Sequence, residues 1–199
     1  MRAVFVDRDG VINANRRDHV KSWNEFVFLP HAVEALVELT KHGLPTVVLT
    51  NQAAINREIT PRRTVEEIHA RMIAVLGAAG ARIDGVFYCP HRPDEGCSCR
   101  KPRPGLLLQA AERLGIDLTE SYLIGDALSD VAAAQAVGCR PILVLTGRGV
   151  GQWLSREARH RRGYAVSRNL WHAVRRILVG EELAEARWLE RLRLSGPLP

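Results

Sequence analysis

Residues 3–10 read Ala3-Val4-Phe5-Val6-Asp7-Arg8-Asp9-Gly10, an apolar run that ends in two aspartates and a glycine. A short apolar run closed by turn-forming residues predicts a buried β-strand. Asp7 and Asp9 would follow that strand, two positions apart. Phosphoryl transfer through an aspartyl-phosphate uses such a pair, because one carboxylate attacks phosphorus while the other exchanges protons with the leaving group and with water. A strand that simply ends in a turn explains the same residues, so the motif alone does not decide the function.

Strand-like and helix-like segments alternate along the chain. Apolar runs predict further strands at residues 46–49, 85–88, 121–124 and 141–145. Apolar spacing, with proline and glycine near the ends, predicts helices within residues 30–43, 60–76, 104–114 and 130–137. Such alternation is typical of right-handed crossovers and a parallel sheet covered on both faces. The predicted fold is α/β, a Rossmann-like three-layer fold with a central, mostly parallel sheet.

Polar residues follow several of these strands, and in such sheets the ligand crevice lies beyond the carboxyl ends of the strands. Thr50 and Asn51 offer a hydroxyl and an amide that could bind phosphoryl oxygens. Asp126 could join Asp7 on Mg²⁺, a hard ion that prefers carboxylate and phosphate oxygens. Asp130 begins a helix, so capping and orienting are both open to it. Each residue alone is equally consistent with an ordinary strand or helix end.

The segment at residues 89–99 contains metal-ligand residues in a compact loop: Cys89, His91, Cys97 and Cys99. Three thiolates and one imidazole make a closed tetrahedral site, which indicates a structural zinc ion rather than a catalytic one. Buried free cysteines are the alternative. Cys139 lies outside the group and is most simply a small buried apolar residue.

The composition excludes few classes of function. Hydrophobic residues make up 46% and charged residues 25% of the 199 residues, which is ordinary for a globular protein. No run approaches the ~18 apolar residues of a membrane span, and a cytoplasmic enzyme is expected. The net charge of +6 is compatible with nucleic acid, with a small anionic substrate or with a simple bias toward arginine.

Taken in order, the motifs resemble those of the haloacid dehalogenase superfamily of phosphatases. The matching segments are Asp7-Arg8-Asp9-Gly10-Val11, Thr50-Asn51-Gln52, Lys101, and Gly125-Asp126 with Asp130. The Cys/His loop runs into Cys99-Arg100-Lys101-Pro102, which narrows the resemblance to one branch. That branch holds the D-glycero-D-manno-heptose 1,7-bisphosphate 7-phosphatases and the histidinol-phosphate phosphatases. The resemblance covers residues 1 to about 150.

The resemblance implies a role for each motif. Asp7 would be the nucleophile and Asp9 the general acid and base, while Thr50 and Lys101 would stabilise the transferring phosphoryl group. Mg²⁺ would be held by Asp7, the backbone carbonyl of Asp9, and Asp126, with Asp130 behind them. Substrate contacts would come from Asn51, Gln52, Arg57, Arg17 and Arg100, of which Arg100 would grip a second phosphate. The zinc ligands would position Arg100 and Lys101, and no large cap domain is expected.

The sequence identifies the substrate less closely than it identifies the reaction. The stretch at residues 24–30, the spacing from Thr50 to Arg57, and Pro104-Gly105 resemble the heptose enzymes more closely. Positions that depart from that pattern are Ala53, Ala54, Glu58, Ala127 and the pair Asp18-His19. All of them lie where substrate contacts would be made. Removal of the 7-phosphate of the heptose bisphosphate is therefore the expectation, with histidinol phosphate or another small sugar phosphate as the alternative.

Two functions of other classes compete with this one. A basic zinc-containing nucleic-acid module would gather cations and aromatics on the metal loop, but the loop carries Asp94 and Glu95. A non-catalytic scaffold would be favoured by loss of a first-motif aspartate, and both are present. The expected organisation is a phosphatase domain at residues 1–180, with its zinc loop at 89–99, and a helical tail at 181–199. The expected partner is a small phosphorylated sugar, without nucleic acid or membrane, and the expected state is a monomer.

Overall fold

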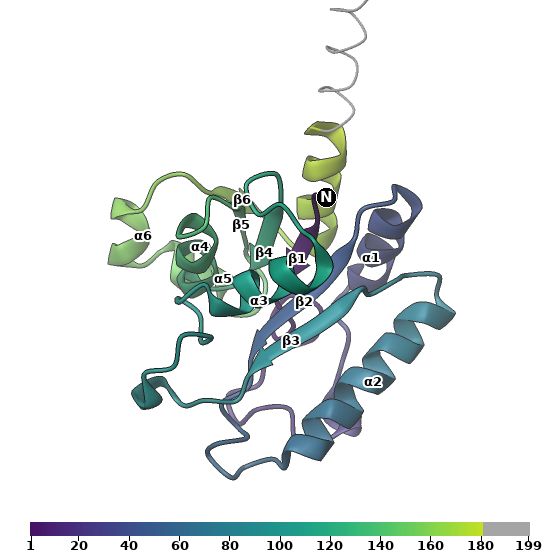
Figure 1. Cartoon of the computed structure of the whole chain (residues 1–199), viewed down its shortest axis with the longest axis vertical. Coiled ribbons are helices and arrows are strands. Elements are labelled where there is room, and N and C mark those ends of the chain that lie inside the picture. The colour runs from purple at the N-terminus through teal and green to yellow at the C-terminus, as the bar shows by residue number, and fades with distance from the viewer. Residues whose placement is uncertain (181–199) are drawn as a thin grey trace, which may run out of the picture.

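A parallel six-stranded sheet forms the centre of the computed structural model, which describes residues 1–180 (Figure 1). The strand order is β3-β2-β1-β4-β5-β6, and every neighbouring pair runs parallel. The strands are β1 (Val4–Val6), β2 (Thr46–Asn51), β3 (Gly85–Cys89), β4 (Tyr122–Gly125), β5 (Arg140–Val144) and β6 (Ala165–Ser167). The first strand lies at the middle of the sheet, which places residues 7–10 between the ends of β2 and β4.

Helices cover both faces of the sheet. They are α1 (Ala32–Lys41), α2 (Arg62–Ala78), α3 (Gly105–Leu114), α4 (Leu128–Gln135), α5 (Gly149–Trp153) and α6 (Arg156–His160), followed by helical residues 170–180. Val4 and Val6 pack into the core under α1, α2 and the helix at 170–180, while Phe5 packs into the core under α3 and α4. Alternate residues of a strand point to opposite faces, so one short strand supplies both cores. The predicted three-layer α/β fold is confirmed.

Some predicted boundaries were wrong. The helix expected at 130–137 is α4, which begins at Leu128 and ends at Gln135. Asp130 is therefore its third residue, and Oδ2 of Asp130 accepts a hydrogen bond from the backbone nitrogen of Ala127 at 3.1 Å. The strand β6 was not predicted, because three residues that follow a basic run carry too little apolar pattern. That basic run, residues 155–162, contains the short helix α6.

The connections that follow the carboxyl ends of β1, β2 and β3 are mostly irregular. Between β1 and α1 the one regular element in the described chain is the 3₁₀ turn η1 (Trp23–Glu25), and residues 52–61 between β2 and α2 hold no helix or strand. The zinc loop contains the 3₁₀ turn η2 (Pro93–Glu95). No helix among residues 1–180 is long and apolar enough to cross a membrane. The expected helical tail at 181–199 lies outside the described residues.

Candidate active site

The carboxyl ends of β1, β2 and β4 meet around one cavity of about 760 Å³. Its lining contains residues from the first motif, from β2, from the segment after the zinc loop, and from the loops after β4 and β5. The lining residues are Asp7, Asp9, Asn15, Arg16, Arg17, His19, Thr50, Asn51, Ala53, Arg57, Arg100, Lys101, Ser129, Asp130, Gly147 and Arg148. Residues far apart in the sequence thus converge on one cavity, as their places near the carboxyl ends of the strands predicted.

A buried ion-pair cluster lies at the base of the cavity. The ammonium nitrogen of Lys101 lies 3.0 Å from Oδ1 of Asp7 and 2.6 Å from Oδ1 of Asp130. Burial raises the pKa of Asp7, Lys101 lowers it, and the neighbouring carboxylates raise it again, so that it stands at about 7. Burial lowers the pKa of Lys101, but the charges of Asp130 and Asp7 outweigh that effect and leave it raised. Lys101 therefore stays cationic beside the carboxylate that would attack phosphorus.

Three carboxylates in this cluster fit a divalent cation. Oxygens of Asp7, Asp126 and Asp130 all lie within 4.8 Å of one another, and all three residues are buried. Three acidic groups there face the two cations Lys101 and Arg148, which leaves an excess of negative charge that Mg²⁺ would offset. Gly10 and Gly147 pack against Asp126 so closely that a Cβ on either would overlap Oδ2 of that residue. The predicted magnesium set of Asp7 and Asp126 therefore lies together, with Asp130 alongside it.

Asp9 is held by donors on both carboxylate oxygens. Nη2 of Arg8 lies 2.9 Å from Oδ1 and 2.8 Å from Oδ2. Asn13 Nδ2 donates to Oδ1 at 2.9 Å, and Gln52 Nε2 donates to Oδ2 at 2.7 Å. Burial raises the pKa of Asp9, but the Arg8 charge and these hydrogen bonds outweigh it and hold that pKa below its ordinary value.

Two of the predicted substrate contacts are also structural. Gln52 is buried, is absent from the cavity lining, and donates to Thr50 Oγ1 at 2.8 Å as well as to Asp9. Asn51 lines the cavity but also bonds the Lys101 backbone twice, donating to its carbonyl oxygen at 3.1 Å and accepting from its nitrogen at 3.2 Å. The end of β2 is thereby tied to the segment that carries the lysine.

The rim of the cavity is strongly basic. Five arginines line it, of which Arg17, Arg57 and Arg100 were predicted as substrate contacts. A further arginine of the lining, Arg148, was not assigned by the sequence reasoning. Nη2 of Arg148 lies 3.2 Å from Oδ1 of Asp126, and its backbone nitrogen donates to Oδ2 at 2.8 Å. Its position directly after the strand-end pair Thr146-Gly147 was a signal that could have identified it.

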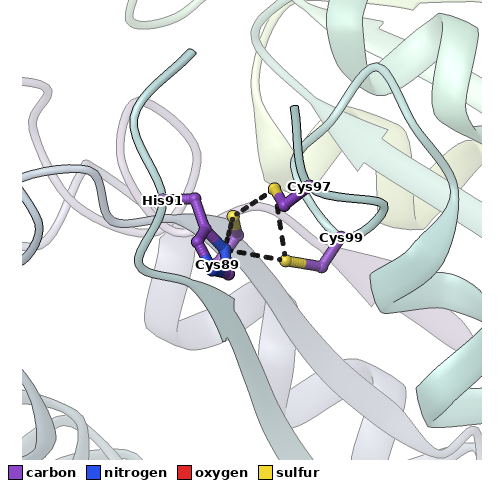
Figure 2. Close-up of side chains that lie close together, drawn as sticks. All are labelled: Cys89, His91, Cys97 and Cys99. Carbon is purple, nitrogen blue, oxygen red and sulfur yellow. Dashed lines mark hydrogen bonds between the residues drawn. The ribbon is translucent and has the colours of Figure 1, made fainter. Parts of the chain in front are cut away.

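The four predicted zinc ligands converge at the end of β3 (Figure 2). Nδ1 of His91 lies 3.5 Å from Sγ of Cys89 and 3.3 Å from Sγ of Cys99. Sγ of Cys97 lies 3.6 Å from each of the other two sulfurs. Metal–sulfur bonds of ~2.3 Å at tetrahedral angles separate ligand atoms by roughly 3.8 Å, so the donor set fits zinc with little rearrangement.

Zinc at this site would hold in place the segment that leads to Lys101. Cys99 directly precedes Arg100 and Lys101, and Nη1 of Arg100 donates to the carbonyl oxygen of the ligand His91 at 3.2 Å. Arg103 also donates to the carbonyl oxygen of Cys97. The predicted zinc ligands therefore belong to the same loop as the cavity residues Arg100 and Lys101.

The chain is similar to known proteins. A family model described as haloacid dehalogenase-like hydrolase matches residues 1–135, and one described as HAD-hydrolase-like matches residues 98–173. The chain is 44% identical over 149 residues to the D-glycero-beta-D-manno-heptose-1,7-bisphosphate 7-phosphatase of Pseudomonas putida, covering 75% of this chain and 85% of the relative. The Pseudomonas aeruginosa enzyme of the same name is 42% identical over 147 residues, covering 74% of this chain and 83% of the relative.

A solved structure agrees with these matches. The D,D-heptose 1,7-bisphosphate phosphatase from B. bronchiseptica, crystallised with magnesium and phosphate, superposes with a TM-score of 0.84 at 36% identity. The match covers 90% of this chain and 99% of that structure. The family model matches well over half of the chain, and the two relatives are matched over most of their own length. This protein belongs to the haloacid dehalogenase-like hydrolase family.

Proposed function

We propose that this hydrolase is a magnesium-dependent phosphomonoesterase that removes the 7-phosphate of D-glycero-D-manno-heptose 1,7-bisphosphate through an aspartyl-phosphate on Asp7. The observation that carries the proposal is the buried cluster in which Lys101 lies 3.0 Å from Asp7 at the base of an arginine-lined cavity. The likeness to named heptose bisphosphate phosphatases supports the choice of substrate.

The first half-reaction transfers the phosphoryl group to the protein. A carboxylate oxygen of Asp7 attacks phosphorus, the bond from phosphorus to the sugar oxygen breaks, and Asp9 in its protonated form gives a proton to that oxygen. The lowered pKa of Asp9 makes this protonated form the minor one at neutral pH. Lys101 and the Thr50 hydroxyl would stabilise the negative charge on the phosphoryl oxygens. Mg²⁺ held by Asp7, Asp126 and the Asp9 carbonyl would supply further neutralisation of that charge.

The second half-reaction releases phosphate. Asp9, now ionised, takes a proton from a water molecule, whose oxygen attacks the phosphorus of the aspartyl-phosphate. The bond between phosphorus and Asp7 breaks, which frees inorganic phosphate and restores both aspartates. The hydrogen bonds that lower the pKa of Asp9 favour the ionised form that this step needs.

The rim supports a substrate with two phosphates. Arginine recognises phosphate through paired donors, and Arg17, Arg57 and Arg100 all line the cavity that holds Asp7. Histidinol phosphate carries one phosphate and a cationic amine, which this basic rim would repel. The bisphosphate is therefore favoured over the alternative on charge alone.

The expected partner is this small sugar phosphate, and the expected state is a cytoplasmic monomer. One cavity of a single chain holds all the proposed catalytic side chains, which supports a monomer. Sedimentation at micromolar concentration tests the monomer directly, and a dimer would contradict it.

Phosphate release with Mg²⁺ tests the proposed function. The panel should hold both anomers of the heptose bisphosphate, histidinol phosphate, other sugar monophosphates and p-nitrophenyl phosphate. The expected result is highest kcat/KM on a heptose bisphosphate and loss of activity in Asp7→Asn. Absence of activity on every substrate, or unchanged activity in Asp7→Asn, would overturn the phosphatase assignment.

A further inference from the structure

The side chain of Arg8 is buried and its guanidinium is turned toward Asp9. Its side chain is 1% exposed, and Nη2 contacts both carboxylate oxygens of Asp9. The guanidinium carbon lies 5.9 Å from the centre of the Phe26 ring. Nε of Arg8 has no hydrogen-bond partner among the described residues, so Nη1 and Nη2 make the polar contacts that orient the group.

The partner of Nη1 is His69, on the buried face of α2. Nε2 of His69 lies 3.0 Å from Nη1 of Arg8, and His69 is 5% exposed. Because a guanidinium only donates, Nε2 must accept and the imidazole is neutral, with its proton on Nδ1. Burial, and then the charge of Arg8, lower the pKa of His69 to about 3, which agrees with a neutral ring throughout the physiological range.

We propose that His69 is a positioning residue that fixes the guanidinium of Arg8 and, through it, aims the carboxylate of Asp9 at the leaving oxygen. This inference rests on the proposed function, in which Asp9 is the general acid. A chain of two hydrogen-bond contacts runs from α2 through Arg8 to the reacting carboxylate, and none of the motifs that identified the family includes His69. Asn13 and Gln52 also hold Asp9, but each contacts a single oxygen, while Arg8 contacts both.

A purely structural histidine would satisfy a buried arginine without affecting the reaction, and the leaving group separates the two roles. An alkyl oxygen of a sugar needs a proton as it leaves, whereas p-nitrophenolate leaves without one. Correctly placed general acids contribute ~10²–10⁴-fold to rate. A misaligned Asp9 should therefore slow the sugar phosphate far more than the aryl phosphate.

The experiment compares kcat/KM for the two substrates, because this constant reports the steps through formation of the aspartyl-phosphate. His69→Met removes the acceptor at similar volume, and His69→Gln restores an acceptor oxygen. We expect His69→Met to lower kcat/KM on heptose bisphosphate by ~10–100-fold but on p-nitrophenyl phosphate by less than ~3-fold. His69→Gln should recover most of the loss on the sugar phosphate. Met72→Leu, buried on the same helix, is the matched control and should leave the ratio of the two constants unchanged.

Each outcome decides the proposal. Equal losses on both substrates in His69→Met, or no loss, would show a structural histidine and overturn the inference while leaving the phosphatase assignment intact. Wild-type protein without activity on any phosphomonoester would overturn the assignment and the inference together. Where His69→Met fails to fold, His69→Asn takes its place, since its amide is too short to reach Arg8. His69→Asn should then change the ratio of kcat/KM on the sugar phosphate to kcat/KM on the aryl phosphate, and His69→Gln should not. Identical ratios for the two variants would overturn the proposal.

Discussion

The ammonium nitrogen of Lys101 lies 3.0 Å from Oδ1 of Asp7, and neither side chain is more than 6% exposed. The same nitrogen contacts Asp130 at 2.6 Å and donates to the carbonyl oxygen of Leu49 at 2.8 Å. Lys101 is therefore held on several sides and is kept next to Asp7, the proposed nucleophile. A cation fixed in this way is organised before substrate arrives, which is the condition for strong stabilisation of charge in the transition state.

Replacing this lysine should remove catalysis more than binding. We expect Lys101→Met to lower kcat by ~10²–10³-fold, the range seen when one preorganised group that stabilises developing charge is removed. Lys101→Arg should not restore the rate, because a planar fork cannot occupy a pocket shaped for a compact ammonium. Steady-state kinetics on the heptose bisphosphate checks this. The control is Lys41→Met, whose side chain is 63% exposed, and a kcat loss as large in that variant would contradict the prediction.

Magnesium affinity should rise with pH. The pKa of Asp7 is raised to about 7 and the pKa of Asp126 is also raised, in both cases chiefly by burial, so the metal must displace protons. Titration calorimetry of the zinc-loaded protein should show tighter binding at pH 8 than at pH 6, with proton release seen as a dependence of the heat on the buffer. Equal Mg²⁺ affinity at pH 6 and pH 8 would contradict this prediction.

The same shift has a consequence for stability. Asp7 keeps its proton in the folded protein at pH values where the unfolded chain, with a pKa near 3.8, has lost it. The folded state then binds more protons, so stability without Mg²⁺ should fall as pH rises from about 4 to about 7. Mg²⁺ should reduce this loss of stability, and Asp7→Asn should weaken the dependence of stability on pH.

How much of the site was visible in the sequence depended on how each residue reaches the cavity. Asp7, Thr50 and Asp126 could be predicted to lie close together because each stands at, or directly after, the carboxyl end of a strand. The zinc ligands could be predicted because residue type and spacing suffice for a closed tetrahedral site. Arg148 reaches Asp126 across two loops, and His69 reaches Arg8 from the buried face of a helix. Those contacts depend on how the layers pack, which local sequence patterns do not specify.

Loss of a zinc ligand should weaken both the fold and the activity. Cys97→Ser should abolish stoichiometric zinc, lower the melting temperature and reduce kcat, because the ligand loop leads directly into Arg100 and Lys101. Metal analysis, thermal unfolding and phosphate release measure the three effects. Cys139→Ala is the matched control, since Cys139 is buried outside the cluster, and it should keep one zinc per chain. If Cys97→Ser kept both its zinc and its activity, the assignment of Cys97 as a ligand of a structural zinc ion would be contradicted.

The glycine of the first motif should tolerate no side chain. Gly10 has φ +89°, and a Cβ there would overlap the Asp126 carboxylate, so Gly10→Ala must strain the backbone and displace a proposed magnesium ligand. We expect weaker Mg²⁺ binding by calorimetry and a kcat loss of about tenfold or more, on the scale that small misplacements of reacting groups cost. Gly43→Ala separates strain from displacement, because Gly43 has φ +65° with no atom near its would-be Cβ. It should cost stability of about 1 kcal/mol and leave Mg²⁺ affinity unchanged. Equal Mg²⁺ affinities in the two variants would show that the close approach of Gly10 to Asp126 has no part in holding the metal.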